Sequence, residues 1–422
     1  MRCGKCCDGW KRSSVLLAVL AIAGTTSGAQ FELPRQSFLI DETIPIVVSG
    51  LPPDAEVTVR LSDGEWSSNA TFIADSAGIV DLTRMSPNRG TYKGVDPMGL
   101  FWSATRSTQP PPPGSPLPTA ENAPKPWQLT ADVRGSTVAT ATVLRRTVAE
   151  KVAVTILRER GLVGVYYQPA GGARHPAILV LGGSGGGVPP AASFPGGLAS
   201  HGYAVLALAY FGIEDLPPSL SRIPLEYFKT ALDWMAAQPT IDPARIGVLG
   251  SSRGAELALL IAALYSQQVR TVVAYLPSNV VWGGCCDRMN APSWTLDGQP
   301  LLWARPGDFV ATRRAEIPVE RIRGGVLLIS GKRDGVWHST QMADAIIDRL
   351  KRNHFAYSMA HLAYDDAGHA IGRPGLPTTD IDEIRHPLTG RVMHLGGSPV
   401  GTAHAREDSW PRMLAFVDEE LR

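Results

Sequence analysis

The sequence has few cysteines, almost no net charge, and no long hydrophobic run outside its N-terminal segment. Its 422 residues include 5 Cys, and 40 Lys and Arg are balanced by 39 Asp and Glu. Proteins that bind nucleic acid generally concentrate basic residues on one surface, so this balance leads us to expect no nucleic-acid partner. The cysteines match neither a disulfide framework nor the spacing of zinc ligands.

The one prominent apolar run lies near the N-terminus and has the layout of an export signal. Residues 15–23 are apolar, follow four basic residues, and precede the small residues Ser27-Gly28-Ala29. The run is too short to cross about 30 Å of hydrocarbon as a helix. We predict a cleaved signal peptide over residues 1–29, no membrane span after cleavage, and a periplasmic or secreted protein. If the signal is not genuine, the protein is cytoplasmic.

Two adjacent cysteines, Cys285 and Cys286, are the only ones that follow the apolar run. Neighbouring Cα atoms lie about 3.8 Å apart across a trans peptide, which is closer than a disulfide prefers. We therefore expect both side chains to pack as small residues in the loop 282–286. A redox pair or an intermolecular bridge is the alternative.

The chain changes its hydrophobic period near residue 159. Before that point, short alternating segments such as 56–61, 71–74 and 137–143 are separated by turn-forming residues. Such spacing indicates an antiparallel β-sandwich. We assign residues 30–158 to a small immunoglobulin-like sandwich domain.

Residues 159–422 alternate apolar strands with helical segments. The segments 177–181, 204–208 and 326–329 are apolar throughout, whereas 225–236 has apolar residues at helical spacing. Strands that are apolar on both sides indicate a parallel sheet covered by helices on both faces. The fold class of this second domain is therefore α/β.

The segment Gly250-Ser251-Ser252-Arg253-Gly254 fits the G-x-S-x-G elbow of α/β-hydrolases. A buried strand precedes it and an apolar helix follows, as the elbow requires. The flanking glycines allow a strained turn that raises the Ser252 hydroxyl above the sheet edge. Ser251 is a weaker candidate because it has no glycine two positions before it or two positions after it. The alternative is a Ser-Gly turn without chemistry.

A serine hydroxyl needs a base that accepts its proton, and in this fold an acid and then a histidine follow the serine along the chain. Asp334 follows the strand 326–330, and His369 lies in a loop late in the chain. We predict both as catalytic. Alternative candidates are the acids Asp365 and Asp366 and the histidines His354 and His361.

A glycine-rich segment, 182–187, follows the first buried strand of the α/β domain. We predict that the backbone N–H of Gly183 or Ser184 and that of Arg253 form an oxyanion hole, where each donor stabilises the transition state by about 3–4 kcal/mol. The segment lacks the strict dinucleotide-binding pattern, so we expect no cofactor. We expect no metal either, because the histidines of the C-terminal region lack ligand spacing and are typical of loops; these are His386, His394 and His404.

Several motifs resemble the acyl-CoA thioesterase / bile acid-CoA:amino acid N-acyltransferase family over almost the whole chain after the signal. They are 90–103, 206–212, 225–228, 249–257 (with Arg253 where Lys is usual), Gly396-Gly397, His404-Ala405 and Ser409-Trp410. The resemblance implies a β-sandwich ahead of an α/β-hydrolase domain. It also implies that Asp334 and His369 are the acid and the histidine of the catalytic set.

The resemblance further implies a serine hydrolase that cleaves fatty acyl-CoA thioesters to fatty acid and CoA through an acyl-enzyme. The N-acyltransferases of the family carry Cys as nucleophile, so Ser252 favours hydrolysis. An export signal conflicts with a CoA substrate, because CoA thioesters are made and held in the cytosol. The alternatives are therefore an exported carboxylesterase acting on another acyl ester, an amino acid N-acyltransferase, or a binding protein without activity.

Overall fold

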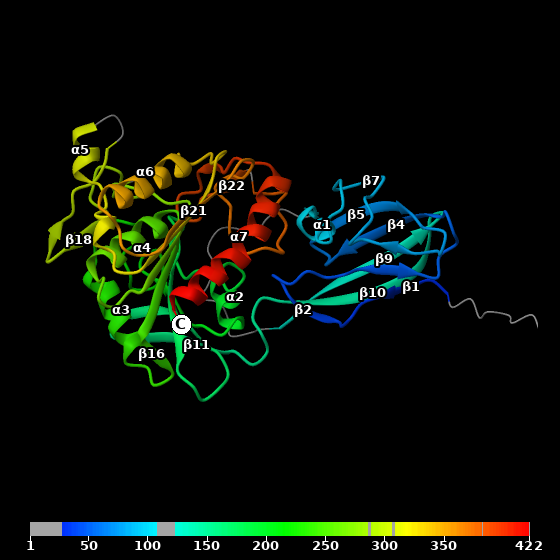
Figure 1. Ribbon diagram of the computed structural model, residues 1–422, viewed down its shortest axis with the longest axis horizontal. Helices are drawn as coiled ribbons and strands as arrows, with labels where there is room; N and C mark the ends of the chain where they lie inside the picture. The colour runs from blue at the N-terminus through cyan, green and yellow to red at the C-terminus, as the bar shows by residue number, and fades with distance from the viewer. Residues whose placement is uncertain (1–27, 108–122, 286–287, 306–308, 382, 422) are drawn as a thin grey trace, which may run out of the picture.

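The computed structural model describes residues 28–107, 123–285, 288–305, 309–381 and 383–421. The predicted signal peptide lies almost entirely outside these ranges, so it stays a prediction. Within them, no helix combines the length and the hydropathy that crossing a membrane requires. The chain forms a mainly β N-terminal part, which holds the short helix α1, and a larger part that combines a sheet with helices (Figure 1).

The N-terminal part consists of two packed sheets, as the alternating pattern predicts. Side chains in β4 alternate between buried and more exposed positions, and its inward residues Val57, Val59 and Leu61 join the core between the sheets. One pairing departs from the antiparallel rule, because β2 runs parallel to β10. The smaller sheet is β1 (Gln30–Glu32), β3 (Val47–Ser49) and β6 (Val80–Asp81). The larger sheet is β2 (Ser37–Leu39), β10 (Ser136–Arg146), β9 (Lys125–Val133), β4 (Glu56–Ser62), β5 (Trp66–Ile73) and β7 (Arg89–Gly90), with β8 (Thr105–Arg106) also on β5.

The second part has the α/β-hydrolase architecture. In the described residues its central sheet has eight strands, of which the six from β14 to β21 are parallel and β11 and β12 form an antiparallel edge. In spatial order they are β11 (Ala153–Glu159), β12 (Leu162–Gln168), β14 (Ala204–Ala209), β13 (His175–Leu181), β16 (Ile241–Ser251), β17 (Thr271–Tyr275), β20 (Gly325–Gly331) and β21 (Met359–Tyr364).

Helices cover both faces of this sheet because successive strand side chains point to opposite sides. Leu179 belongs to a core cluster that includes residues of α3, α4 and α6, whereas its neighbours Ile178 and Val180 belong to a cluster that includes residues of α2 and α7. These helices are α2 (Pro195–Ser200), α3 (Glu226–Ala236), α4 (Arg253–Leu264), α6 (Ser339–Arg352) and α7 (Pro399–Glu420). The remaining elements are α1 (Gly99–Trp102), α5 (Phe309–Arg314), η1 (Val319–Arg321), β15 (Ile223–Pro224), β18 (Trp294–Leu296), β19 (Gln299–Pro300), β22 (Glu383–Arg385) and β23 (Val392–His394).

The change from one sheet system to the other falls between β10 and β11. Strand β11 pairs with β12 along its whole length, so it belongs to the sheet of the second part. The boundary that we predicted, between residues 158 and 159, therefore lies at the end of a strand of the second part. Alternation alone did not reveal this, because β11 lies at the edge of its sheet, with exposed and half-buried residues at most of its positions.

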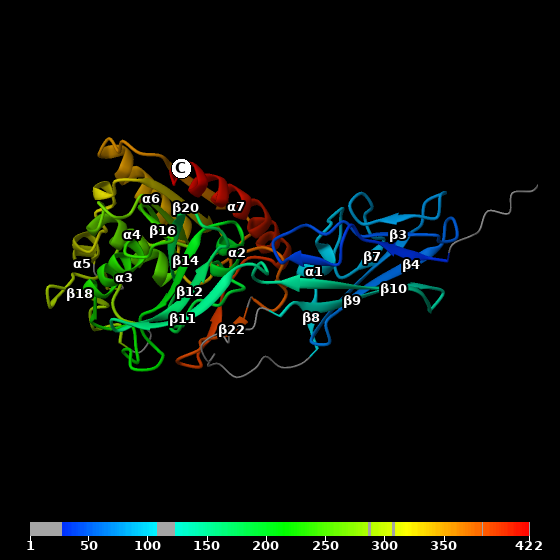
Figure 2. The ribbon, with the colours of Figure 1, turned by 90° about the horizontal axis from the view of Figure 1, so that it is seen from below.

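The two parts contact each other through α7, the loop after His369 and His201 at the end of α2. The first residues of α7 lie beside the sandwich in both views (Figures 1 and 2). Asp41 of the sandwich is buried and accepts hydrogen bonds from Arg373, from His201 at 2.7 Å and from Trp410 Nε1 at 3.0 Å. Burial alone would raise the pKa of Asp41, but His201 and Arg373 outweigh it and hold that pKa well below its usual range. The contact is therefore a charged one that stays ionised.

Candidate active site

The candidate nucleophile, Ser252, occupies a sharp turn between β16 and α4. Its backbone has φ +58° and ψ −122°, a conformation that costs free energy for a residue with a side chain. The turn leaves no room for side chains on either flank. A Cβ at Gly250 would lie 1.9 Å from the carbonyl oxygen of Gly254, and a Cβ at Gly254 would lie 2.4 Å from that of Gly182. The G-x-S-x-G spacing is therefore a steric requirement of this turn.

Three polar side chains from separate loops meet at this turn. His369 Nε2 lies 2.8 Å from Ser252 Oγ, and His369 Nδ1 lies 2.9 Å and 2.8 Å from the two carboxylate oxygens of Asp334. The side chains of His369 and Asp334 are only 7% and 2% exposed. Asp334 follows β20 and His369 follows β21, so adjacent parallel strands deliver both to the same edge of the sheet. The structure thus brings together all three residues that we predicted as catalytic.

The alternative acids and histidines lie elsewhere. Asp365 is 85% exposed and pairs with Lys332, and Asp366 pairs with Arg333. His361 lies on β21, where its ring contacts Ser330 and Asp344. His354 lies just after α6, and Ser251 is the last residue of β16. None of these five side chains has a hydrogen bond to Ser252 or His369 in the described part of the chain.

A short segment before α7 joins the loops of the acid and the histidine. The carbonyl oxygen of Leu395 accepts hydrogen bonds from the N–H of His369 at 2.7 Å and of Gly335 at 3.0 Å. Gly396 follows with φ +69°, and its carbonyl would lie 1.9 Å from a Cβ at Gly368. Sequence reasoning gave this segment no role in the site, although the Gly396-Gly397 pair was a visible signal of close backbone approach.

Trp337 also supports the histidine. Its ring meets that of His369 edge to face at a centroid distance of 5.7 Å, and its Nε1 donates to the carbonyl of Leu276 at 3.2 Å. Its N–H donates at 3.1 Å to the Asp334 oxygen that also accepts from Val336. No spacing rule points to Trp337 from the sequence.

The glycine-rich segment lies beside the nucleophile. A Cβ at Gly183 would lie 3.2 Å from Ser252 Cβ and 3.7 Å from Ser252 Oγ. Arg253 begins α4, so its N–H is one of the helix's initial amides, which have no carbonyl partner four residues earlier. Ser184 turns its hydroxyl to His386, at 3.2 Å from Nε2. We keep Gly183, Ser184 and Arg253 as the proposed oxyanion donors.

Two histidines differ from our expectation of ordinary loop residues. His386 is buried, and burial lowers the pKa of its ring. Its contact with Ser184 ties the C-terminal region to the glycine-rich segment. His404 lies on α7 and not in a loop, since the helix begins at Pro399. Residue spacing in a Gly- and Pro-rich stretch did not predict the start of this helix.

The side chain of Arg253 forms a buried network that sequence reasoning did not foresee. Its guanidinium donates to the Gly283 carbonyl at 2.8 Å and to Ser293 Oγ at 2.6 Å, and its Nε lies 3.2 Å from a Glu256 carboxylate oxygen. Glu256 also accepts from Trp294 Nε1 at 2.9 Å. Burial raises the pKa of Glu256, while the charge of Arg253 opposes the rise. The network fastens the start of α4 to the segment 282–294.

The expectation that Cys285 only packs as a small residue is wrong, because Cys285 is disulfide-bonded. Its partner lies outside the described residues, as does Cys286.

A cavity of about 320 Å³ opens beside the nucleophile. Small-molecule sites commonly measure about 300–1,000 Å³ and combine apolar walls with a few polar groups. This cavity fits that description, since two guanidinium groups interrupt a largely apolar lining. The lining comprises 180–183, 185–186, 188–190, 192–194, Ser251, 369–373, Leu376 and Arg406.

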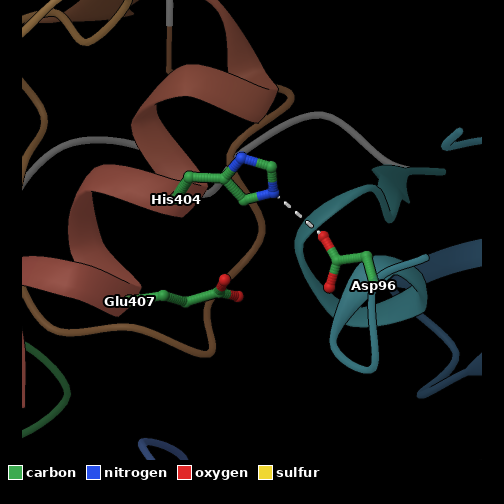
Figure 3. Close-up of side chains that lie close together, drawn as sticks. All are labelled: Asp96, His404 and Glu407. Carbon is green, nitrogen blue, oxygen red and sulfur yellow. Dashed lines mark hydrogen bonds and ion pairs between the residues drawn. The ribbon is translucent and has the colours of Figure 1, made fainter. Parts of the chain in front are cut away.

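Asp96, His404 and Glu407 form a cluster with metal-ligand spacing between the two parts, their candidate ligand atoms all within 4.8 Å of one another (Figure 3). Asp96 already accepts hydrogen bonds from Trp102 Nε1 at 2.7 Å, Met98 N–H at 2.9 Å and His404 Nε2 at 3.1 Å. These bonds use both of its oxygens. We therefore interpret the cluster as an interdomain contact.

Comparisons with known proteins place this arrangement in a family. Residues 41–159 match the model described as "Acyl-CoA thioester hydrolase/BAAT N-terminal region", and residues 223–290 and 308–422 match "BAAT / Acyl-CoA thioester hydrolase C terminal". Mouse (Mus musculus) acyl-coenzyme A amino acid N-acyltransferase 2 is 32% identical over 407 residues, which cover 91% of this chain and 96% of the mouse protein. Mouse acyl-coenzyme A thioesterase 6 is 31% identical over 417 residues, covering 90% and 94%. The chain therefore belongs to the acyl-CoA thioester hydrolase/BAAT family.

Proposed function

We propose that this protein hydrolyses fatty acyl-CoA thioesters through an acyl-enzyme on Ser252. The observation that carries the proposal is the continuous hydrogen-bonded path from Ser252 through His369 to Asp334. Such a path allows a weakly acidic hydroxyl to lose its proton as it attacks a carbonyl carbon. Membership of a family that includes thioester hydrolases supports the choice of substrate.

In the proposed first half-reaction, Ser252 Oγ attacks the thioester carbonyl and His369 Nε2 accepts the hydroxyl proton. The carbonyl oxygen becomes an anion that the backbone N–H groups of Gly183 or Ser184 and of Arg253 stabilise. The carbon–sulfur bond then breaks, and His369 gives its proton to the departing thiolate. Asp334 holds the histidine in the tautomer that has its proton on Nδ1 and stabilises the imidazolium.

In the second half-reaction, water attacks the acyl oxyester while His369 again accepts a proton. Collapse of the second anion breaks the bond to Ser252 and releases the fatty acid, while His369 returns the proton to Ser252 Oγ. An oxyester reacts less readily with amines than a thioester on cysteine does, so a serine nucleophile favours water over an amino acid as acceptor. Acyl transfer to an amino acid remains the second candidate function, because one relative is named an N-acyltransferase.

The compartment decides which acyl compound the protein meets. We keep the signal peptide over residues 1–29 and export as proposals, with a carboxylesterase acting on a non-CoA ester as the function that export would favour. N-terminal sequencing of the protein from its native host tests cleavage after Ala29.

Turnover of matched substrates by residues 30–422 tests the proposed function. We expect CoA release from palmitoyl-CoA, loss of that activity in Ser252→Ala, and free palmitate as the product even with glycine present. Asp365→Asn is the control, because that acid is 85% exposed, pairs with Lys332 and lies outside the site. Hydrolysis of a p-nitrophenyl acyl ester without CoA release would replace the thioesterase with the carboxylesterase. Formation of N-palmitoylglycine would favour acyl transfer.

A further inference from the structure

Arg406 is a cation without an acidic partner in the described part of the chain. It projects from α7 toward the loop of the catalytic histidine, where its Nε donates to the Ala370 carbonyl at 2.9 Å. Its Nη1 is buried and has no hydrogen-bond partner. No carboxylate pairs with Arg406 among the residues that the structure describes. A buried donor that lacks a partner costs free energy, more so when it carries a charge, so it calls for an explanation.

The second guanidinium that lines the cavity, that of Arg373, has the acidic partner that Arg406 lacks in the described residues. Arg373 is buried too, but it pairs with Asp41 and donates to the Thr147 carbonyl at 2.6 Å. Its charge and its donors are therefore satisfied within the protein. Burial lowers the pKa of Arg406 to about 10, and no neighbouring anion opposes the change. Arg406 still carries its charge at neutral pH.

Arg406 lines the same cavity as the catalytic histidine. His369 and Ser251 lie in its wall together with the glycine-rich segment that flanks Ser252. The wall also carries apolar side chains, among them Phe194, Ile371 and Leu376, which suit an acyl chain. A substrate held by Ser252 in this cavity would thus meet apolar surface and an uncompensated guanidinium.

We propose that Arg406 binds a carboxylate on one of the reactants, at a distance from the carbonyl that Ser252 attacks. A carboxylate matches the planar donors of a guanidinium and would satisfy the unpartnered Nη1. The carboxylate has two possible sources, namely the far end of a dicarboxylic acyl chain or an amino acid acceptor. This proposal deepens the function above and rests on it.

Paired substrates test the assignment. The ratio of kcat/KM for 7-carboxyheptanoyl-CoA to that for octanoyl-CoA should fall about 10- to 100-fold in Arg406→Gln, because a hydrogen bond to a charged group is lost. Arg406→Lys should recover part of the ratio. Arg412→Gln is the matched control on the same helix, since Arg412 is exposed and pairs with Asp408. A second arm supplies octanoyl-CoA with glycine and measures N-octanoylglycine by mass spectrometry.

The outcomes separate the two sources and the opposing explanation. A changed substrate ratio identifies the acyl carboxylate, and amide formation that Arg406→Gln abolishes identifies the amino acid. An equal loss on both acyl substrates, without Arg406-dependent amide, would show that Arg406 only holds Ala370 or meets a CoA phosphate, and would overturn the proposal.

A binding assay keeps the proposal testable if thioesters are not the substrates. Suberate should slow the labelling of Ser252 by a fluorophosphonate more than octanamide does, because octanamide carries no carboxylate, and Arg406→Gln should remove that difference. Protection by suberate without thioester turnover would refute the proposed function and keep the anion subsite. Equal protection by both compounds in the wild type would overturn the subsite.

Discussion

Replacing Asp334 with Asn tests the role of the acid with little change in shape. In the wild type both carboxylate oxygens lie within 2.9 Å of His369 Nδ1, so the proton sits on Nδ1 and Nε2 is free to accept from Ser252. Asn can keep one oxygen as acceptor for the N–H groups of Val336 and Trp337. Its NH₂ would then face Nδ1 and favour the tautomer that carries the proton on Nε2.

That tautomer cannot accept the proton of the Ser252 hydroxyl. The side chains of Asp334 and His369 are 2% and 7% exposed, so bulk water has little access to replace the lost acceptor. We expect kcat to fall about 10⁴-fold at pH 7, as for a triad that is held in the wrong tautomer. This corresponds to about 5.4 kcal/mol of transition-state stabilisation.

The assay is single-turnover release of thiol from palmitoyl-CoA, with thermal unfolding as the control for folding. Asp365→Asn removes a carboxylate four residues before His369, and we expect less than a threefold change from it. A fall of less than tenfold in folded Asp334→Asn would refute the role that we give to Asp334.

Two further predictions concern stability. Arg253→Met leaves the buried Glu256 without its cation, so the free energy of unfolding in urea should fall by about 3–5 kcal/mol. The double variant Arg253→Met with Glu256→Leu should recover most of this loss. An unchanged urea midpoint in the single variant would contradict the prediction. Burial and the charge of Asp96 raise the pKa of Glu407 from 4.5 to about 7, so wild-type stability should fall as pH rises between these values. The free energy of unfolding of Glu407→Gln should equal that of the wild type near pH 4.5. At pH 8 it should be higher by about 1–3 kcal/mol, a range that allows for solvent screening of the charge. Thermal unfolding of both proteins across this pH range tests the prediction. A stability difference that does not change with pH would contradict the raised pKa of Glu407.

Local steric rules explain why the elbow could be predicted from sequence. A Cβ at either glycine that flanks Ser252 would clash with a backbone carbonyl, so the motif itself encodes the turn. In a parallel sheet, only loops at the carboxyl ends of the strands can bring an acid and a histidine to the serine. Asp334 and His369 both follow strands that end at that edge.

The rest of the site depends on contacts between segments far apart in the chain. Leu395 joins the loops of Asp334 and His369 through backbone atoms, which no side-chain pattern reports. Two of the partners of Arg253, Gly283 and Ser293, lie 30 and 40 residues further along the chain. Nothing in the sequence marks Arg406 as an arginine without an acidic partner, because the fold decides which side chains form ion pairs.

Mass spectrometry of peptides from the enzyme quenched during turnover tests the central claim most directly. With palmitoyl-CoA as substrate, we predict a palmitoyl group on the peptide that contains Ser252, and its accumulation when acyl-enzyme hydrolysis is slowed at low pH. An enzyme that releases CoA while this peptide stays unmodified, or that carries the acyl group on another residue, would contradict the account.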